Sequence, residues 1–141
     1  MRAKDINVEW DIVTGVLNML YTANVKDIKN IEKKIKIYYL LIDKGNDEVV
    51  PDKMDLDSYK KGLITYLGFR LNYLFKIMKP KANEWMKKVS LEAVSEDVVL
   101  VDEESNPEHS YRKLLAEMMD NMFTGNLNFK YKGELVMVKQ Q

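Results

Sequence analysis

The chain has 141 residues, the size of one domain, and we expect residues 1–141 to form a single domain. It contains no cysteine, which excludes disulfides, thiolate metal sites and cysteine nucleophiles. Its 22 basic and 22 acidic residues give a formal net charge of zero, whereas a dedicated nucleic-acid-binding protein usually carries a basic excess.

Two amphipathic helices are predicted in the first third of the chain. Over residues 6–22, apolar side chains recur at intervals of three and four, which is the spacing of one helix face. A second helix is predicted from about residue 24 to Gly45, because glycine is typical of the position after a helix end. Its apolar face would consist of Ile28, Ile31, Ile35, Tyr38 and Ile42.

The centre of the chain predicts two more helices. Residues 46–57 form an acidic connection broken by Pro51, and a helix is expected from residue 57 or 58 to Lys79, before Pro80. Between residues 63 and 78, apolar residues fall on nearly every side of this helix, which is typical of the buried centre of a bundle. A short helix over residues 81–90 follows.

The last third predicts a strand, a helix and a hairpin. Residues 97–101 form a short apolar run, and Asn106-Pro107 marks the start of a helix that continues to Phe123. Residues 127–138 read as a hairpin, because Gly133 lies between two β-prone runs and accepts a positive φ.

The expected fold class is therefore mainly α. A bundle of four to five helices carries a small C-terminal β element, namely the hairpin 127–138, to which the strand 97–101 adds a third strand. The helical body covers about residues 6–95. The acidic connection, the last helix and the hairpin cover about residues 96–141.

The sequence contains no recognisable catalytic, metal-binding or phosphate-binding motif. The only histidine, His109, is followed by Ser110, but adjacent residues on a helix do not face each other. The acidic residues between 47 and 57 lack the ligand spacing of a calcium loop. We therefore expect no catalytic residue, metal or cofactor, and no enzyme.

Two sets of side chains are candidates for partner binding. Tyrosine tolerates half-burial, which suits an interface, and methionine adapts to varied partner surfaces. Both sets have an alternative interpretation as ordinary core. The candidates are Tyr59, Tyr66 and Tyr73, at intervals of seven, and Met118, Met119 and Met122.

A lysine-rich segment supports an alternative function in nucleic-acid binding. Lysines attract phosphates, and Trp85 would be a ring on which a base could stack. The candidate lysines are Lys76, Lys79, Lys81, Lys87 and Lys88. A second alternative is an enzyme whose carboxylate site the sequence does not reveal.

The leading hypothesis is a non-enzymatic interaction protein: a self-assembling or partner-binding adaptor, or an inhibitor. Its partner would be a protein or a second copy of the chain, with nucleic acid less favoured and no membrane. Charges at Asp5, Glu9 and Asp11 interrupt any signal-peptide core, so we expect a cytoplasmic location. The Lys-, Asn- and Ile-rich composition resembles that of small proteins of low-GC bacteria, their phages and mobile elements.

Overall fold

The computed structural model describes residues 19–28, 35–123 and 130–135. The strands in these ranges are β1 (Met19–Asn24), β2 (Lys36–Tyr39), β3 (Val98–Asp102) and β4 (Lys130–Leu135). The helices are α1 (Val25–Ile28), α2 (Lys53–Lys60), α3 (Tyr66–Ile77), α4 (Pro80–Ser95) and α5 (Tyr111–Phe123). Two short 3-10 turns, η2 (Asp47–Val49) and η3 (Pro107–His109), lie in the connections.

The four strands form one parallel sheet in the order β2-β3-β1-β4. Tyr21 of β1 pairs with Val99 of β3, which pairs with Ile37 of β2. The protein thus has an α/β fold, and the predicted helical bundle with a small β element is wrong. Parallel strands need long crossover connections, and here helices provide them.

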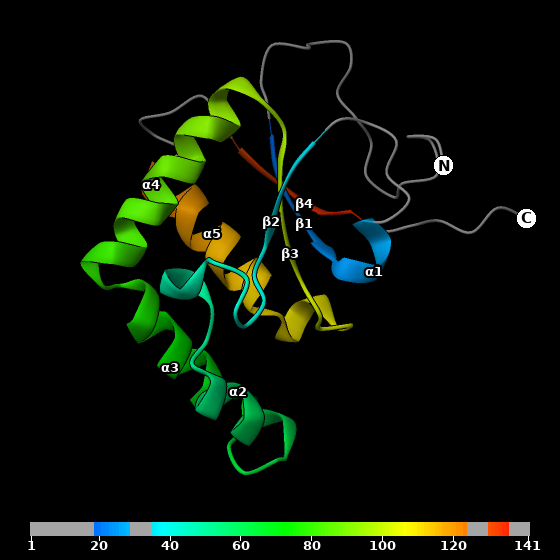
Figure 1. Ribbon diagram of the computed structural model, residues 1–141, viewed down its shortest axis with the longest axis vertical. Helices are drawn as coiled ribbons and strands as arrows, with labels where there is room; N and C mark the ends of the chain where they lie inside the picture. The colour runs from blue at the N-terminus through cyan, green and yellow to red at the C-terminus, as the bar shows by residue number, and fades with distance from the viewer. Residues whose placement is uncertain (1–18, 29–34, 124–129, 136–141) are drawn as a thin grey trace, which may run out of the picture.

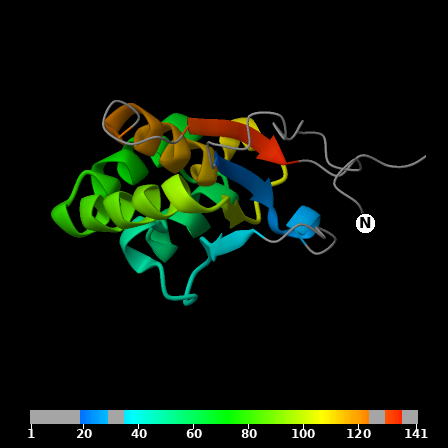
Figure 2. The same cartoon turned by 90° about the horizontal axis from the view of Figure 1, so that it is seen from above.

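The helices cover the two faces of the sheet unequally. The connection from β1 passes β3 to reach β2, whereas the next two connections run in the opposite direction across the sheet. Right-handed crossovers therefore place α1 on one face and the later helices on the other. Figures 1 and 2 show α3, α4 and α5 together on one side of the strands and α1 on the opposite side.

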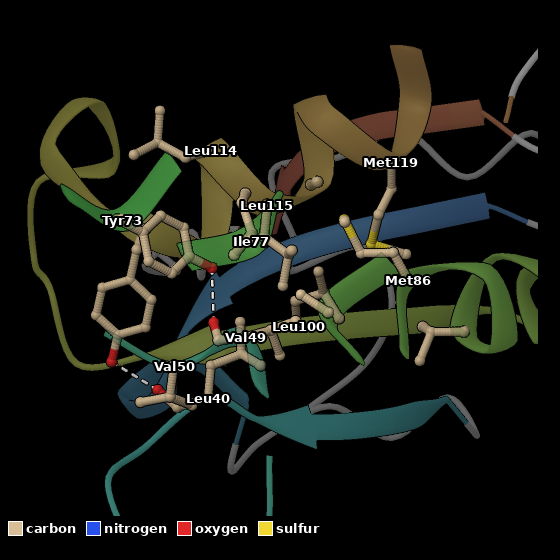
Figure 3. Close-up of a cluster of buried hydrophobic side chains, with 14 of the residues drawn as sticks. Leu40, Val49, Val50, Tyr73, Ile77, Met86, Leu100, Leu114, Leu115 and Met119 are labelled. Carbon is tan, nitrogen blue, oxygen red and sulfur yellow. Dashed lines mark hydrogen bonds between the residues drawn. The ribbon is translucent and has the colours of Figure 1, made fainter. Parts of the chain in front are cut away.

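The larger core lies between the sheet and α3, α4 and α5 (Figure 3). Leu100 and Leu40 contribute from the strand side, and Ile77, Met86 and Leu115 contribute from the helices. A smaller cluster on the other face contains Tyr21, Val99 and Val101 of the strands and Ile28 of α1. Strands β1 and β3 are therefore buried on both faces.

Two tyrosine hydroxyls hold the connection that follows β2. Tyr73 of α3 donates to the carbonyl oxygen of Val49 at 2.6 Å (Figure 3), and Tyr111 of α5 donates to that of Leu40 at 2.6 Å. Both rings are buried. These bonds satisfy backbone acceptors inside the core and fix the loop between β2 and α2 against the helices.

The first two predicted helices are wrong where the structure describes them. Residues 19–22, at the end of the predicted helix 6–22, belong to β1, and residues 1–18 lie outside the described residues. Among the described residues of the predicted helix 24–45, only residues 25–28 are helical, and residues 36–39 form β2. Residues 29–34 also lie outside the described part of the chain.

The predicted hairpin over residues 127–138 is also contradicted. Residues 130–135 form β4, a single strand parallel to β1, and residues 127–129 and 136–138 lie outside the described ranges. Leu20 of β1 pairs with Tyr131 and Tyr21 pairs with Gly133, so Lys132 is one extra residue in β4. Gly133 has a φ of +119°. The glycine therefore accommodates an irregularity inside a strand and not a hairpin turn.

Three later elements match their predictions more closely. The predicted strand 97–101 is present as β3, and the predicted helix 81–90 lies within α4, which begins at Pro80 and continues five residues further, to Ser95. The last predicted helix is present as α5 after the turn η3. The long helix predicted up to Lys79 is two helices, α2 and α3, separated by a turn in which Gly62 has a φ of +75°.

Candidate partner-binding surface

The helix α3 is the element on which the candidate surface lies. The Thr65 side chain caps its start by accepting a hydrogen bond from the Gly68 backbone N–H at 3.1 Å. Phe69, Tyr73 and Ile77, four residues apart, are buried against the larger core. This spacing keeps them on one face of the helix, and that face anchors α3 to the domain.

The opposite face of α3 is also apolar, and it is exposed. Leu67 is 62% exposed, Leu71 48%, Phe75 69% and Met78, directly after the last helical residue, 67%. We call these four residues the α3 ridge. Each of the first three precedes a core residue of α3 by two positions, which is about 200° around a helix. The ridge therefore points away from the core along the whole helix.

The chain segment that carries the α3 ridge is basic. Residues 60–81 contain six Lys or Arg residues and no Asp or Glu. Lys76 forms an ion pair with Asp52 at 2.8 Å, which neutralises one of these charges. Arg70 and Lys79 are exposed beside and beyond the ridge. A partner that covers the ridge would therefore meet a positive rim formed by residues 60–81, whereas the edge toward α5 carries Glu117 and Asp120.

A hollow of about 500 Å³ lies on the side of α3 that faces α5. Leu74 of α3 and Leu114 and Met118 of α5 give it apolar walls, and Arg70 and Glu117 are at its edge. Leu74 is half-buried and continues the apolar surface from the ridge toward α5. The ridge is thus bordered by a depression that can accept side chains.

The structure separates the three tyrosines that the sequence analysis grouped. Tyr59 is on α2 and Tyr66 on α3, with ring centroids 6.0 Å apart, and both are half-buried. Tyr73 is buried in the core, and burial raises the pKa of its hydroxyl well above the usual value. Tyr73 therefore stabilises the core and is not accessible to a partner.

The three methionines also divide between core and surface. Met119 is fully buried in the larger core, as Figure 3 shows. Met118 and Met122 are half-buried, and Met118 lines the hollow between α3 and α5. Of this set, Met118 is the one that adjoins the α3 ridge.

The five candidate lysines lie on α3, on α4 and between these helices. Lys76 is paired with Asp52, whereas Lys79, Lys81, Lys87 and Lys88 are exposed. Trp85, the ring proposed for base stacking, packs its edge against Tyr38 at a centroid distance of 5.4 Å. Its Nε1 donates to the Asn46 side-chain oxygen at 3.1 Å, so the indole serves a contact within the domain.

The residues of the α3 ridge were absent from the predicted partner-binding set. Their signal was present in the sequence as the helix that is apolar on every side, but that pattern was interpreted as a fully buried helix. The pattern indicates that apolar side chains lie on both faces of α3. Only the fold shows which face the domain itself covers.

Within residues 19–28, 35–123 and 130–135, no group of three or more His, Asp or Glu side chains could hold a metal ion. None of the helices described in these ranges is long and apolar enough to cross a membrane.

Comparisons of the chain with protein-family models, with curated proteins and with solved structures found no match.

Proposed function

We propose that the protein is a non-enzymatic interaction protein that binds a protein partner through the α3 ridge. The observation that carries this proposal is the row of four exposed large apolar side chains on a helix whose other face is in the core. Contiguous exposed apolar patches of this kind mark interaction sites in soluble proteins. No catalytic residue takes part in this function.

The burial of these side chains would supply substantial free energy. Burying a Leu, Phe or Met side chain fully is worth about 1.5–3 kcal/mol, and each ridge residue retains about half or more of its exposure. A helical face of this length presents a row of contacts that another helix can match. Leu67, Leu71, Leu74 and Met78 are spaced four, three and four residues apart, which is the seam spacing of paired helices.

The charges around the α3 ridge favour a particular class of partner. A second copy would bring the basic rim of residues 60–81 against an identical basic rim, which is repulsive. A partner helix with an apolar seam and flanking Asp and Glu residues would instead neutralise that rim. The proposed partner is therefore a protein that presents an acidic amphipathic helix.

The nucleic-acid alternative has less support. The four exposed lysines would attract phosphates, but the half-buried Trp85 is held by Tyr38 and Asn46 and is not a free stacking platform. An exposed apolar ridge has no role in binding a phosphate backbone. These arguments support the protein partner over nucleic acid.

The test uses a synthetic helical peptide with Leu at the seam positions and Glu on both flanks. The full chain should bind this peptide, and the double variant Leu71→Gln/Phe75→Gln should weaken binding by at least about tenfold, or about 1.4 kcal/mol. Leu91→Gln is the matched control, because Leu91 is an exposed leucine on α4, outside the ridge. It should leave binding unchanged.

Three results would overturn the proposal. One is the absence of peptide binding at low and at high salt. Another is a dimer, seen by light scattering behind size exclusion, that the double variant dissociates, since this would assign the ridge to a second copy. The third is ridge-dependent binding of vesicles that contain anionic lipid, without binding of the peptide.

A further inference from the structure

A cavity of about 400 Å³ opens at the carboxyl ends of β2 and β3, away from the α3 ridge. The loops that follow these strands line it with Leu41, Lys44 and residues 103–105, and α2 closes it from outside. Figure 1 shows α2 and the turn before α5 beyond this end of the sheet. In open parallel sheets, ligands bind outside the carboxyl ends of the strands, near the point where connections diverge to opposite faces.

That point of divergence lies between β1 and β3. These strands are neighbours, and their connections leave to opposite faces of the sheet. The Asn24 side-chain amide at the end of β1 donates to the carbonyl oxygen of Glu104 at 2.9 Å. This bond fixes the loop after β3, which forms one wall of the cavity.

The inner part of the cavity is aromatic. Tyr59 stacks on Phe69 with a centroid distance of 4.9 Å and an interplanar angle of 17°. Tyr111 is at the same end, its ring edge-on to Phe69 at 6.4 Å and its hydroxyl held by Leu40. Phe69 and Tyr111 are buried, whereas Tyr59 is half-buried. The stack on Phe69 fixes the Tyr59 ring, and of these three rings it is the one accessible to a planar ligand.

The two walls of the cavity differ in charge. Lys44 and Lys60 lie on the wall formed by the loop after β2 and by α2, and within the described ranges neither forms an ion pair. Lys53, on the same wall, is paired with Asp57 at 2.9 Å. The opposite wall carries two acidic residues, Glu103 and Glu104, and Ser105; of these, Glu103 and Ser105 are exposed at the mouth.

The mouth also holds a positioned histidine. His109 stacks on Tyr66 with a centroid distance of 4.4 Å, and its Nδ1 lies 3.3 Å from the hydroxyl oxygen of Tyr59. The imidazole is thus held at the edge of the aromatic part of the cavity. It is a hydrogen-bonding group that a ligand entering the cavity would meet.

We propose that this cavity binds a mononucleotide: a planar heteroaromatic base joined through a sugar to one phosphate. The base would lie against the ring of Tyr59, and the phosphate would be bound by Lys44 and Lys60. The carboxylate of Glu103 would accept hydrogen bonds from the sugar hydroxyls. Each of the three chemical parts of a nucleotide thus has a matching wall, and the site is separate from the partner surface.

The experiment is a calorimetric titration of the full chain with the 5′-monophosphates of adenosine, guanosine, cytidine and uridine. The corresponding nucleosides and ribose 5-phosphate are titrated in parallel. At least one nucleotide should bind at least about tenfold more tightly than both its nucleoside and ribose 5-phosphate, because each lacks one of the matched parts. Inorganic phosphate should bind no better than ribose 5-phosphate.

Two variants locate the binding. Lys60→Glu should weaken nucleotide binding at least about tenfold, whereas Lys61→Glu, the adjacent exposed lysine that does not line the cavity, should leave it within about twofold. Ser105→Trp, which fills the mouth without touching the core, should abolish binding. Absence of saturable binding by every nucleotide, or equal effects of the two lysine variants, would overturn the proposal. Equal affinity for ribose 5-phosphate and the nucleotide would also overturn it, because the rings would then play no part.

Discussion

Arg112 of α5 binds the carboxylate of Glu134 on β4 through two parallel hydrogen bonds. Its Nε donates to Glu134 Oε1 at 3.1 Å, and its Nη2 donates to Oε2. The same guanidinium donates through Nη1 to the Asp102 carboxylate, at the end of β3. Arg112 and Asp102 are fully buried, so one charged network connects α5 to two strands of the sheet.

Arg112→Met should therefore destabilise the protein by about 3–5 kcal/mol. The substitution would leave the carboxylate of Asp102 buried without its cation. Burial already raises the pKa of Asp102, and the charge and hydrogen bonds of Arg112 oppose that rise. The free energy of unfolding from urea denaturation measures the effect.

Lys113→Met is the matched control for this prediction. Lys113 is the next residue on α5, and its ion pair with Glu108 is at the surface. We expect its denaturation midpoint to equal that of the wild type. Equal losses of stability in the two variants would show that the buried network has no special role.

Tyr73→Phe tests how the loop after β2 is held. The variant keeps the buried ring and removes the hydroxyl that donates to the carbonyl of Val49, which leaves that acceptor unsatisfied inside the core. The expected loss is about 1–3 kcal/mol in the free energy of unfolding. Tyr39→Phe, on an exposed tyrosine of β2, should change it by less than about 0.5 kcal/mol. A loss no larger for Tyr73 than for Tyr39 would contradict this account of the loop.

The sequence predicted α4, α5 and β3 better than β1 and β2, for a physical reason. Parallel strands that are buried on both faces lack the alternation that marks a strand. In β1, Thr22 is buried, and its hydroxyl is satisfied by donating to Glu134 at 2.7 Å. No local sequence pattern reveals such a tertiary contact. In the second segment, Ile35 and Tyr38 have helical spacing but pack on opposite faces of the sheet.

The candidate surface was predictable only in part. The apolar residues on every side of residues 63–78 were visible in the sequence, and both faces of α3 are indeed apolar. Whether a face is covered depends on which elements pack against it. Among the described elements, α3 packs with α2, η2, α4 and α5, which leave Leu67, Leu71 and Phe75 exposed. The cavity at the carboxyl ends was not predictable, because Tyr59 and His109 are 50 residues apart and meet only through the fold.

Glu92 should stabilise the protein at neutral pH, and this contribution should be lost in acid. Burial raises the pKa of Glu92, but hydrogen bonds from Lys36, at 2.8 Å, and from Tyr38 outweigh it and leave the pKa below its usual value of 4.5. A carboxylate with a lowered pKa in the folded state stabilises the protein above the pKa of the unfolded chain. That contribution is lost as the pH falls through the lower, folded-state pKa.

The measurement for Glu92 is thermal unfolding between pH 7 and pH 3, with Glu92→Gln compared to the wild type. The variant should be less stable at pH 7, and the two curves should converge as the pH falls below 4.5, the usual pKa of a glutamate. Glu96→Gln, on the exposed residue after α4, is the control. A constant difference between Glu92→Gln and the wild type over the whole range would show that the ion pair with Lys36 is not the source of the effect.

Met118 and Met119 test the division of α5 between core and surface. Met119 is fully buried, so Met119→Ala should destabilise the protein by about 2–5 kcal/mol through lost burial and the cavity left behind. Met118 is half-buried at the hollow beside α3, so its replacement by Ala should have a smaller effect on stability. In the peptide titration, however, Met118→Ala should weaken binding if the partner helix extends from the α3 ridge into that hollow. Equal destabilisation by the two alanine variants would mean that the hollow is closed in solution, and the partner would then contact the ridge alone.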